Sequence, residues 1–247
     1  MINKQNFLYS EGGGFTPVKA NPEEIEFLII DLFCGAGGTT TGFDKAKLNG
    51  KKCALVIACI NHDPKAIKSH WLNHPEVVHF EEDIRTVELS PLVDILQKYR
   101  LLYPNAKVIL WASLECTNFS KAKGGQPRDA DSRTLADHLD RYITALNPDY
   151  IQIENVVEFM SWGPPNEMSI RLKIIHFMQL YGISDIKMRM LKVSELKVIQ
   201  GFPADYHLFG NQSDQKKFIG NSVVPHVVCA WCEAMAGRVR ELRRIAA

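Results

Sequence analysis

The chain has 247 residues, of which 46% are hydrophobic and 23% are charged, and its formal net charge is +1. These proportions are ordinary for a soluble globular protein, and the length suffices for a sizeable core without disulfide staples. They exclude intrinsic disorder, a collagen-like chain, a disulfide scaffold and an overall composition that binds polyanions through bulk charge.

The first 24 residues are polar and rich in glycine and proline, which predicts a loose arm. No apolar run approaches the roughly 18 residues that a membrane-spanning helix needs. The N-terminus also lacks the apolar centre of a secretory signal. The six cysteines are scattered, as is typical of free thiols in a reducing compartment. We therefore expect a cytoplasmic protein with no membrane partner.

Strand-like apolar runs alternate with helical patterns between residues 25 and 162. Buried strands are predicted over residues 27–33, 53–60, 77–84, 106–114 and 149–157. Helices are predicted over residues 40–47, 64–73, 89–99 and 133–146, the second with Asp63 as its N-cap before Pro64. This alternation predicts an α/β fold whose mostly parallel sheet is covered by helices on both faces.

The alternation of predicted strands and helices ends after residue 162. Helices are predicted over residues 170–180, from about Ser194, and as one long helix over residues 218–245. Cys229 and Cys232 have the spacing of a metal or redox pair, but they lie in an apolar helix with no second ligand pair, which favours a packed face. The four arginines at positions 238, 240, 243 and 244 favour a solvated helix end over a DNA contact. We expect a flexible arm (1–24), a cofactor-binding and catalytic core (25–162) and a C-terminal segment that returns to the core (163–247).

Two groups of residues indicate chemistry at one edge of this sheet. Gly35, Gly37 and Gly38 lie between a predicted strand and a helix, where glycines let the backbone approach a ligand closely. Cys116 follows the fourth strand, and Glu154 and Asn155 follow the fifth. A thiol and a carboxylic acid that face one crevice suit nucleophilic attack with proton donation, whereas an isolated buried cysteine is usually structural.

Six ordered segments resemble the motifs of the DNA (cytosine-5) methyltransferase family. They are DLFCGAGG, ECTNFS, DSRTL, ENV, MLKVSELKVIQGFP and KKFIGNSVVP, and they cover most of residues 27–235. The resemblance implies a Rossmann-like S-adenosylmethionine-dependent methyltransferase that modifies carbon 5 of cytosine in double-stranded DNA. In this family a thiolate adds to carbon 6 of a flipped base, and the activated carbon 5 then takes the methyl group. The resemblance also implies a protein encoded by a bacterium or a phage, with restriction-modification as one biological role.

The resemblance also implies roles for individual residues. Cys116 corresponds to the nucleophile and Glu154 to the group that serves ring nitrogen 3, with Asn155, Ser120 and Arg133 supporting the loop and the base. The cofactor S-adenosylmethionine is expected to contact ten residues by the same match: Phe33, Gly35, Gly37, Gly38, Asn61, Asp83, Ile84, Leu135, Asn221 and Ser222.

Three departures from the family pattern stand out. Glu115 replaces the usual proline before the nucleophile, and a neighbouring carboxylate disfavours the thiolate. Asn61 stands where an acidic residue usually binds the ribose hydroxyls. Only 46 positions separate Glu154 from Gln200, so the target-recognition region is expected to be missing between about residues 160 and 185.

These departures leave two other functions open. A truncated or split relative would hold cofactor or DNA without turnover, and a second polypeptide or an omitted segment would then supply target recognition. An RNA cytosine methyltransferase would share the catalytic motifs, because they do not specify the sugar. The roles expected for Cys116 and for Gly35, Gly37 and Gly38 are the same for a DNA and for an RNA cytosine methyltransferase.

Overall fold

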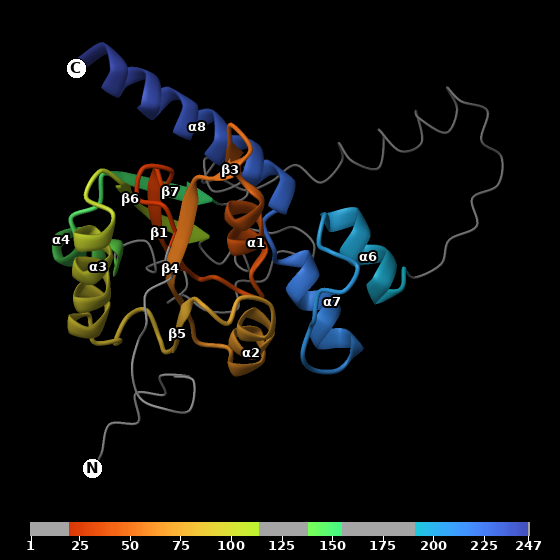
Figure 1. Ribbon diagram of the computed structural model, residues 1–247. Coiled ribbons are helices and arrows are strands. Elements are labelled where there is room, and N and C mark those ends of the chain that lie inside the picture. The colour runs from red at the N-terminus through yellow and green to blue at the C-terminus, as the bar shows by residue number, and fades with distance from the viewer. Residues whose placement is uncertain (1–19, 114–137, 155–190, 247) are drawn as a thin grey trace, which may run out of the picture.

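A five-stranded parallel sheet forms the centre of the molecule, in the order β5-β4-β1-β6-β7 (Figure 1). The computed structural model describes residues 20–113, 138–154 and 191–246. Its sheet consists of β1 (Phe27–Leu32), β4 (Ala54–Asn61), β5 (Val78–Glu81), β6 (Lys107–Ser113) and β7 (Tyr150–Glu154). Each neighbouring pair of these strands is parallel, which confirms the predicted sheet.

Helices cover both faces of the sheet, as predicted. One face is covered by α3 (Ser90–Leu102) and α4 (Leu139–Leu146), whose apolar side chains share a buried cluster with alternate strand residues. The other face is covered by α1 (Gly38–Lys45), α2 (Pro64–Asn73) and α8 (Pro225–Ala246), which share a second cluster. Because β1 is buried along its whole length, both clusters meet at the central strand.

The predicted start of α2 is confirmed in detail. Asp63 accepts hydrogen bonds from the backbone N–H groups of Lys65 (3.0 Å) and Ala66 (3.4 Å), and Pro64 occupies the first turn. An N-cap of this kind satisfies donors that the helix itself cannot pair. This cap matters for function because it fixes the turn that follows β4, at the carboxyl edge of the sheet.

The C-terminal region differs from the prediction of one long helix over residues 218–245. Instead α7 (Gln212–Gly220) ends before a short turn, and α8 begins at Pro225. The residue before a proline avoids helical backbone angles, so a helix cannot run through Val224 into Pro225. Other differences are smaller: α1 begins at Gly38 rather than Thr40, and a hairpin of β2 (Lys47–Leu48) and β3 (Lys51–Lys52) follows it. The short helix α6 (Val193–Gln200) precedes α7 and begins next to the predicted Ser194.

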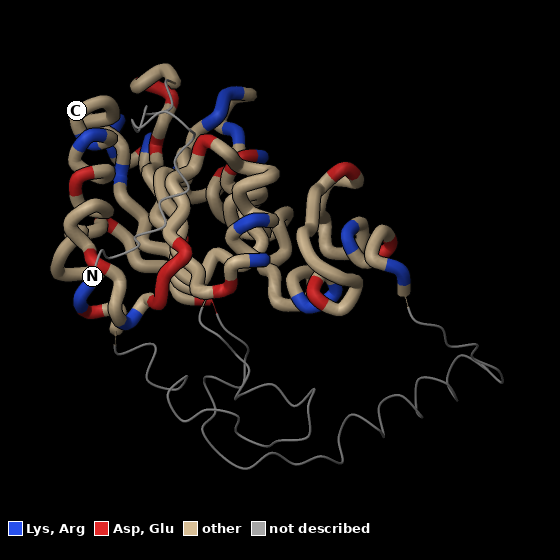
Figure 2. Tube along the Cα trace, turned by 90° about the horizontal axis from the view of Figure 1, so that it is seen from below, with Lys and Arg blue, Asp and Glu red and all other residues tan. Residues whose placement is uncertain are grey.

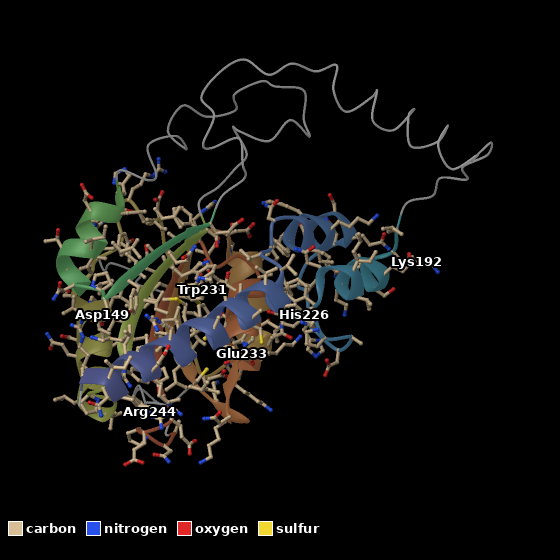
Figure 3. The ribbon with its side chains drawn as sticks, turned by 90° about the horizontal axis from the view of Figure 1, so that it is seen from above. Asp149, Lys192, His226, Trp231, Glu233 and Arg244 are labelled. Atoms are coloured by element: carbon tan, nitrogen blue, oxygen red, sulfur yellow. The ribbon has the colours of Figure 1, made fainter. Side chains whose placement is uncertain are left out.

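Two of the four arginines of α8 differ from the solvated helix end that the sequence suggested, whereas Arg238 and Arg244 are exposed as expected. Arg240 and Arg243 form ion pairs at 2.6 and 2.7 Å with Glu26, whose side chain is only 1% exposed. Figure 3 looks down on α8 as it crosses the sheet, from His226 near its start to Arg244 near its end. Glu26 lies just before β1, so these pairs fasten the end of α8 to the amino edge of the sheet. Cys232 of the same helix is fully buried against the sheet, as expected for a packed face.

Basic and acidic residues are interspersed along the described trace in the view of Figure 2. Among the described residues, no helix combines the length and the apolar character that crossing a bilayer requires.

Candidate functional site

A pocket opens at the carboxyl edge of the sheet, above β1, β4 and β6. It contains about 540 Å³ of atom-free space, including its opening to solvent. In open parallel sheets, ligand sites lie at this edge. Four segments line it: the loop after β1, the turn after β4, the end of β6, and the region from α7 to α8. The lining side chains are Phe33, Cys34, Gly35, Gly38, Thr39, Asn61, His62, Asp63, Ala66, Ser113, Lys217, Phe218, Asn221, Ser222 and Val223.

The loop after β1 takes the shape that its glycines suggest. Phe33 (φ 59°), Gly35 (φ 53°) and Gly37 (φ 99°) all have left-handed backbone angles. The Cys34 N–H donates to the Ile60 carbonyl (3.2 Å), and the Gly37 N–H donates to the Cys34 carbonyl (3.1 Å). The loop therefore turns tightly against β4 and brings the first residues of α1 to the pocket wall.

Gly38 gives the C-terminal segment room to reach this loop. A Cβ at Gly38 would lie 2.7 Å from the Val223 carbonyl oxygen and 3.0 Å from the Ser222 Cβ. Because the nearest atom is backbone, a side chain at Gly38 would push the Ser222–Val223 wall out of place. The glycine cluster and the GNSVV segment, far apart in the sequence, thus form one wall of the pocket.

Gly37 lies in the same loop, but its surroundings differ from those of Gly38. A Cβ there would lie 2.4 Å from the Tyr206 hydroxyl oxygen and 3.2 Å from ring carbons of His70 and His74. Gly37 therefore faces a buried aromatic group behind the loop and does not line the pocket. Tyr206 holds the loop from that side, donating to the Ala36 carbonyl at 2.6 Å.

The turn after β4 is organised by Asn61 and Asp63. Asn61 Oδ1 accepts from the Asp63 backbone N–H at 2.9 Å. Asp63 Oδ2 pairs with Lys217 Nζ at 3.3 Å, and a second pair joins Lys65 Nζ to Asp214 Oδ2 at 2.8 Å. These two ion pairs connect the start of α2 to α7. Lys217 was not among the residues singled out from the sequence, although it lies one helical turn before Asn221 in the KKFIGNSVVP segment.

Asp83 and Ile84 lie one strand farther along the sheet and do not line the pocket. Arg85 binds the Asp83 carboxylate through Nε (3.0 Å) and Nη2 (2.6 Å) and thereby lowers the Asp83 pKa. Ile84 is buried, and its carbonyl accepts from the Tyr142 hydroxyl at 2.8 Å. The loop after β5 is thus held by α4 and by its own ion pair.

Glu154 ends β7 at the same edge of the sheet. It lies in register with Ser113, which lines the pocket at the end of β6. Glu154 is half-buried, and the loss of solvent raises the pKa of its carboxyl group. A carboxyl group in this state holds a proton to a higher pH than an exposed one does.

The structure thus gathers six of the ten expected cofactor residues around one pocket: Phe33, Gly35, Gly38, Asn61, Asn221 and Ser222. Gly37, Asp83 and Ile84 lie elsewhere. The tenth, Leu135, lies outside the described part of the chain, as do four further residues with expected roles: Cys116, Ser120, Arg133 and Asn155.

Comparison with known proteins identifies the family. The model of the C-5 cytosine-specific DNA methylase family matches residues 27–170 and 165–237. The chain belongs to this family. The match includes the loop after β1, Glu154 and the α7–α8 junction, so the pocket is built from segments that the C-5 cytosine methylases share.

Individual relatives match over shorter stretches. The chain is 30% identical over 133 residues to the type II methyltransferase M.AgeI of Thalassovita gelatinovora, a match that covers 53% of this chain and 28% of that protein. It is 29% identical over 150 residues to the DNA-cytosine methyltransferase of Escherichia coli K12, covering 55% of this chain and 31% of that protein. The matches therefore span less than a third of the length of these two relatives.

A solved structure supports the fold. The Dnmt2 methyltransferase of S. pombe aligns with a TM-score of 0.53 and 14% identity, over 87% of this chain and 99% of that one. The methyltransferase EhMeth of Entamoeba histolytica aligns similarly, with a TM-score of 0.52, 14% identity and coverage of 88% and 99%. The chain thus has the Rossmann-like fold of S-adenosylmethionine-dependent methyltransferases.

Proposed function

We propose that this chain transfers a methyl group from S-adenosylmethionine to carbon 5 of cytosine in double-stranded DNA. The observation that supports this most directly is the shared edge of the sheet. The pocket opens at this edge, next to the loop after β1. The half-buried Glu154 lies at the same edge, in register with the end of β6, the strand that precedes Cys116 in the sequence. The family match supplies the reaction class.

The pocket suits S-adenosylmethionine by the chemistry of its lining. Phe33 and Phe218 offer aromatic surface for a base, whereas Asn61 and Ser222 offer neutral polar groups for hydroxyls. The start of α1 and Lys217 provide partial and full positive charge for a carboxylate. When bound, this cofactor supplies an electrophilic methyl group.

Cys116 is proposed as the nucleophile. Its thiolate forms a bond to carbon 6 of a cytosine that has left the base stack, and electron density then moves to carbon 5. After transfer, loss of the proton from carbon 5 and cleavage of the carbon–sulfur bond regenerate the thiolate. Asn155, Ser120 and Arg133 are proposed to position the loop and the base.

Glu154 is proposed to serve ring nitrogen 3 of the base. The thiolate addition puts negative charge into the ring, and a proton donor at nitrogen 3 relieves it. Partial burial raises the pKa of the Glu154 carboxyl group, because desolvation penalises its charged form. Glu154 in this environment is therefore better suited to donate a hydrogen bond than an exposed glutamate would be.

Target recognition is proposed to come from elements other than the described pocket. Sequence is read by contacts to base edges in a groove, whereas phosphate contacts only position the protein. The walls of the pocket are used to build the cofactor site and leave little surface for that task. A further segment or a second polypeptide is the proposed reader.

Covalent trapping tests this proposal. A duplex in which 5-fluorocytosine replaces cytosine has no proton to lose at carbon 5, so the wild-type chain is expected to form a stable adduct when S-adenosylmethionine is present. Peptide mapping should place the adduct on Cys116, and Cys116→Ala should form none while still binding the cofactor. Cys53→Ala, a change at a buried cysteine of the core, is the matched control and should still form the adduct.

The acceptor is tested in parallel with labelled S-adenosylmethionine. Label in duplex DNA supports the proposal, whereas label in tRNA alone would transfer the same chemistry to RNA. Cofactor binding with no label in either acceptor would identify a non-catalytic relative. An adduct on another cysteine would refute the role of Cys116.

A further inference from the structure

A group of thiol and imidazole side chains lies beneath the loop after β1, and of its members only Cys34 also lines the pocket. Cys34 follows β1, Cys59 lies in β4, His70 in α2 and His79 in β5. All four are buried, with exposed fractions of 5% or less. Four potential metal ligands thus meet inside the protein from four different segments.

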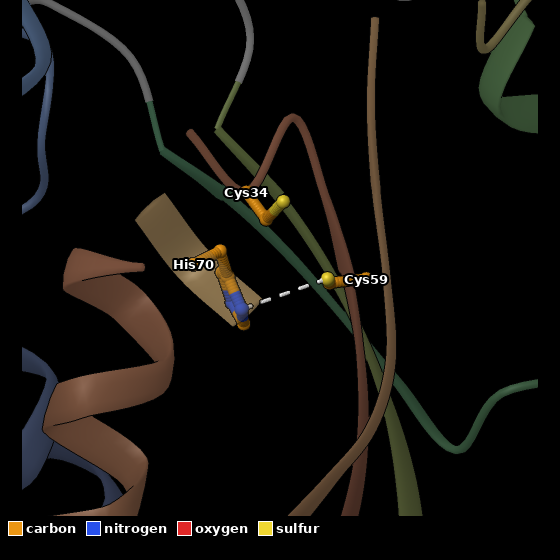
Figure 4. Close-up of side chains that lie close together, drawn as sticks. All are labelled: Cys34, Cys59 and His70. Carbon is orange, nitrogen blue, oxygen red and sulfur yellow. Dashed lines mark hydrogen bonds between the residues drawn. The ribbon is translucent and has the colours of Figure 1, made fainter. Parts of the chain in front are cut away.

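The strand register explains why they meet. Asp31, Cys59 and His79 lie side by side on β1, β4 and β5, so their side chains project from the same face of the sheet. The helix α2 crosses that face and places His70 over the row. Cys59 Sγ lies 3.8 Å from His70 Nδ1, as Figure 4 shows, and His70 Nδ1 lies 2.8 Å from His79 Nε2.

The distances among three of these four residues, Cys34, Cys59 and His70, fit one small tetrahedral ion. The donor atoms of Cys34, Cys59 and His70 all lie within 4.8 Å of one another. Zinc bonds of about 2.3 Å to sulfur and about 2.0 Å to nitrogen place neighbouring ligands roughly 3.5 Å apart. The sulfur-to-nitrogen distance is close to this value, and the two imidazoles need to separate by only about half an ångström.

The surroundings of His70 are those of a metal ligand. Thr40 Oγ1 donates to Asp31 Oδ2 (3.3 Å), and its oxygen lies 2.9 Å from His70 Nε2. With its own proton on Asp31, the Thr40 oxygen accepts the Nε2 proton, which leaves the Nδ1 lone pair directed towards Cys59. Metal-binding histidines are generally oriented by such a hydrogen bond from the other ring nitrogen.

We propose that Cys34, Cys59 and His70, with His79 as the fourth ligand, form a buried zinc site. Two thiolates and two imidazoles are a ligand set that Zn²⁺ prefers, and a site closed on all sides is structural rather than catalytic. The ion joins the glycine loop to β4, α2 and β5. It stabilises the loop that lines the pocket, independently of whether methyl transfer occurs.

Metal analysis of the purified full-length chain tests the site. The wild type, prepared without chelator or histidine tag and exposed to ZnCl₂, is expected to retain about one zinc per chain after dialysis. Cys34→Ala and Cys59→Ala are expected to lose it. Cys53→Ala and Cys232→Ala are matched controls, because these two buried thiols also share a hydrogen bond but have no imidazole beside them, and both should keep the zinc.

Cobalt provides a direct spectroscopic readout. Co²⁺ added to the metal-free wild type should produce thiolate charge-transfer absorption and the intense visible bands of a tetrahedral site. Removal of the metal should lower the thermal midpoint of the wild type, because an ion that binds only the folded state stabilises it. Neither of these measurements depends on whether the variants fold.

Three results would overturn the proposal. The first is a wild type that retains no zinc and shows no tetrahedral cobalt spectrum. The second is zinc retained equally by Cys34→Ala and Cys59→Ala. The third is a disulfide between Cys34 and Cys59 in protein purified under reducing conditions, which would indicate a redox pair in place of a metal site.

Discussion

The attachment of α8 to Glu26 allows a graded test of stability. Arg240 and Arg243 both bind the Glu26 carboxylate, and they also reach backbone carbonyls, Arg240 that of Glu23 at 3.3 Å and Arg243 that of Asn105. The guanidinium side chains are 33% and 37% exposed, whereas the Glu26 side chain is 1% exposed. Loss of the Glu26 carboxylate therefore leaves two guanidinium groups that water can reach. Loss of both arginines leaves a buried carboxylate that water cannot reach.

The expected costs follow from this asymmetry. Breaking a fully buried ion pair costs about 3–5 kcal/mol, because it strands a charge without a partner. Arg240→Ala and Arg243→Ala each leave Glu26 one partner, so we expect about 1–2 kcal/mol from each, below that range. The double variant leaves Glu26 with neither arginine, and we expect about 4–5 kcal/mol, more than the sum of the single changes. Glu26→Ala should cost about 2–3 kcal/mol, because both arginines rehydrate.

Urea unfolding measures these free energies, with thermal midpoints as a check. Each kcal/mol should lower the midpoint by about 2–4 °C in a protein of this size. Arg238→Ala is the matched control, since Arg238 pairs with Glu241 on the exposed side of the same helix and both are 59% exposed. That change should cost less than about 0.5 kcal/mol. The reasoning would be refuted if the double variant lost no more unfolding free energy than the two single variants lose in sum, because Glu26 would then not depend on these partners.

Two further predictions concern the pocket and Glu154. Gly38→Ala should weaken S-adenosylmethionine binding at least about tenfold, or roughly 1.4 kcal/mol, because the added carbon displaces the Val223 carbonyl; calorimetric titration measures this, with Gly237→Ala, where the added carbon meets open space, as the unaffected control. An unchanged affinity would remove this wall from the cofactor site. Because burial raises the Glu154 pKa, the protonated fraction falls as the pH rises through that raised value, so methyl transfer should decline on the alkaline side. Glu154→Gln should abolish this pH dependence and lower kcat by about 10²-fold or more, and a variant that keeps the same alkaline limb would assign the limb to another group.

Local patterns in the sequence predicted most of the described core. Short apolar runs predicted the five strands of the sheet, and the Asp63-Pro64 pair predicted the start of α2. Both signals are local, because strand burial and helix capping depend on residues that are neighbours in the sequence. The break at Pro225 was also a local signal, which the prediction of one helix over residues 218–245 missed. The glycine cluster and the GNSVV segment were predicted to serve one site, and they do form one pocket wall.

Other features depend on contacts between distant residues, which no local pattern encodes. Arg240 meets Glu26 from the far end of the chain, so its arginine-rich helix resembled a solvated one. His70 and His79 lie in different elements and come together only through the strand register and the path of α2. Gly37 has the same sequence context as Gly38, yet backbone geometry turns the two towards opposite sides of the loop.

The position of α8 has a consequence for the synthesis of the protein. The sheet face that contains Phe27, Ile109 and Trp111 is closed by Val228 and Cys232 of this helix. All five strands of the central sheet precede α8 in the sequence, so they leave the ribosome while this face of the sheet still lacks part of its cover. A nascent chain that ends before Pro225 therefore presents an apolar sheet surface, which is the kind of intermediate that aggregates or engages chaperones. Complete folding of this sheet is expected to wait until α8 has been synthesised.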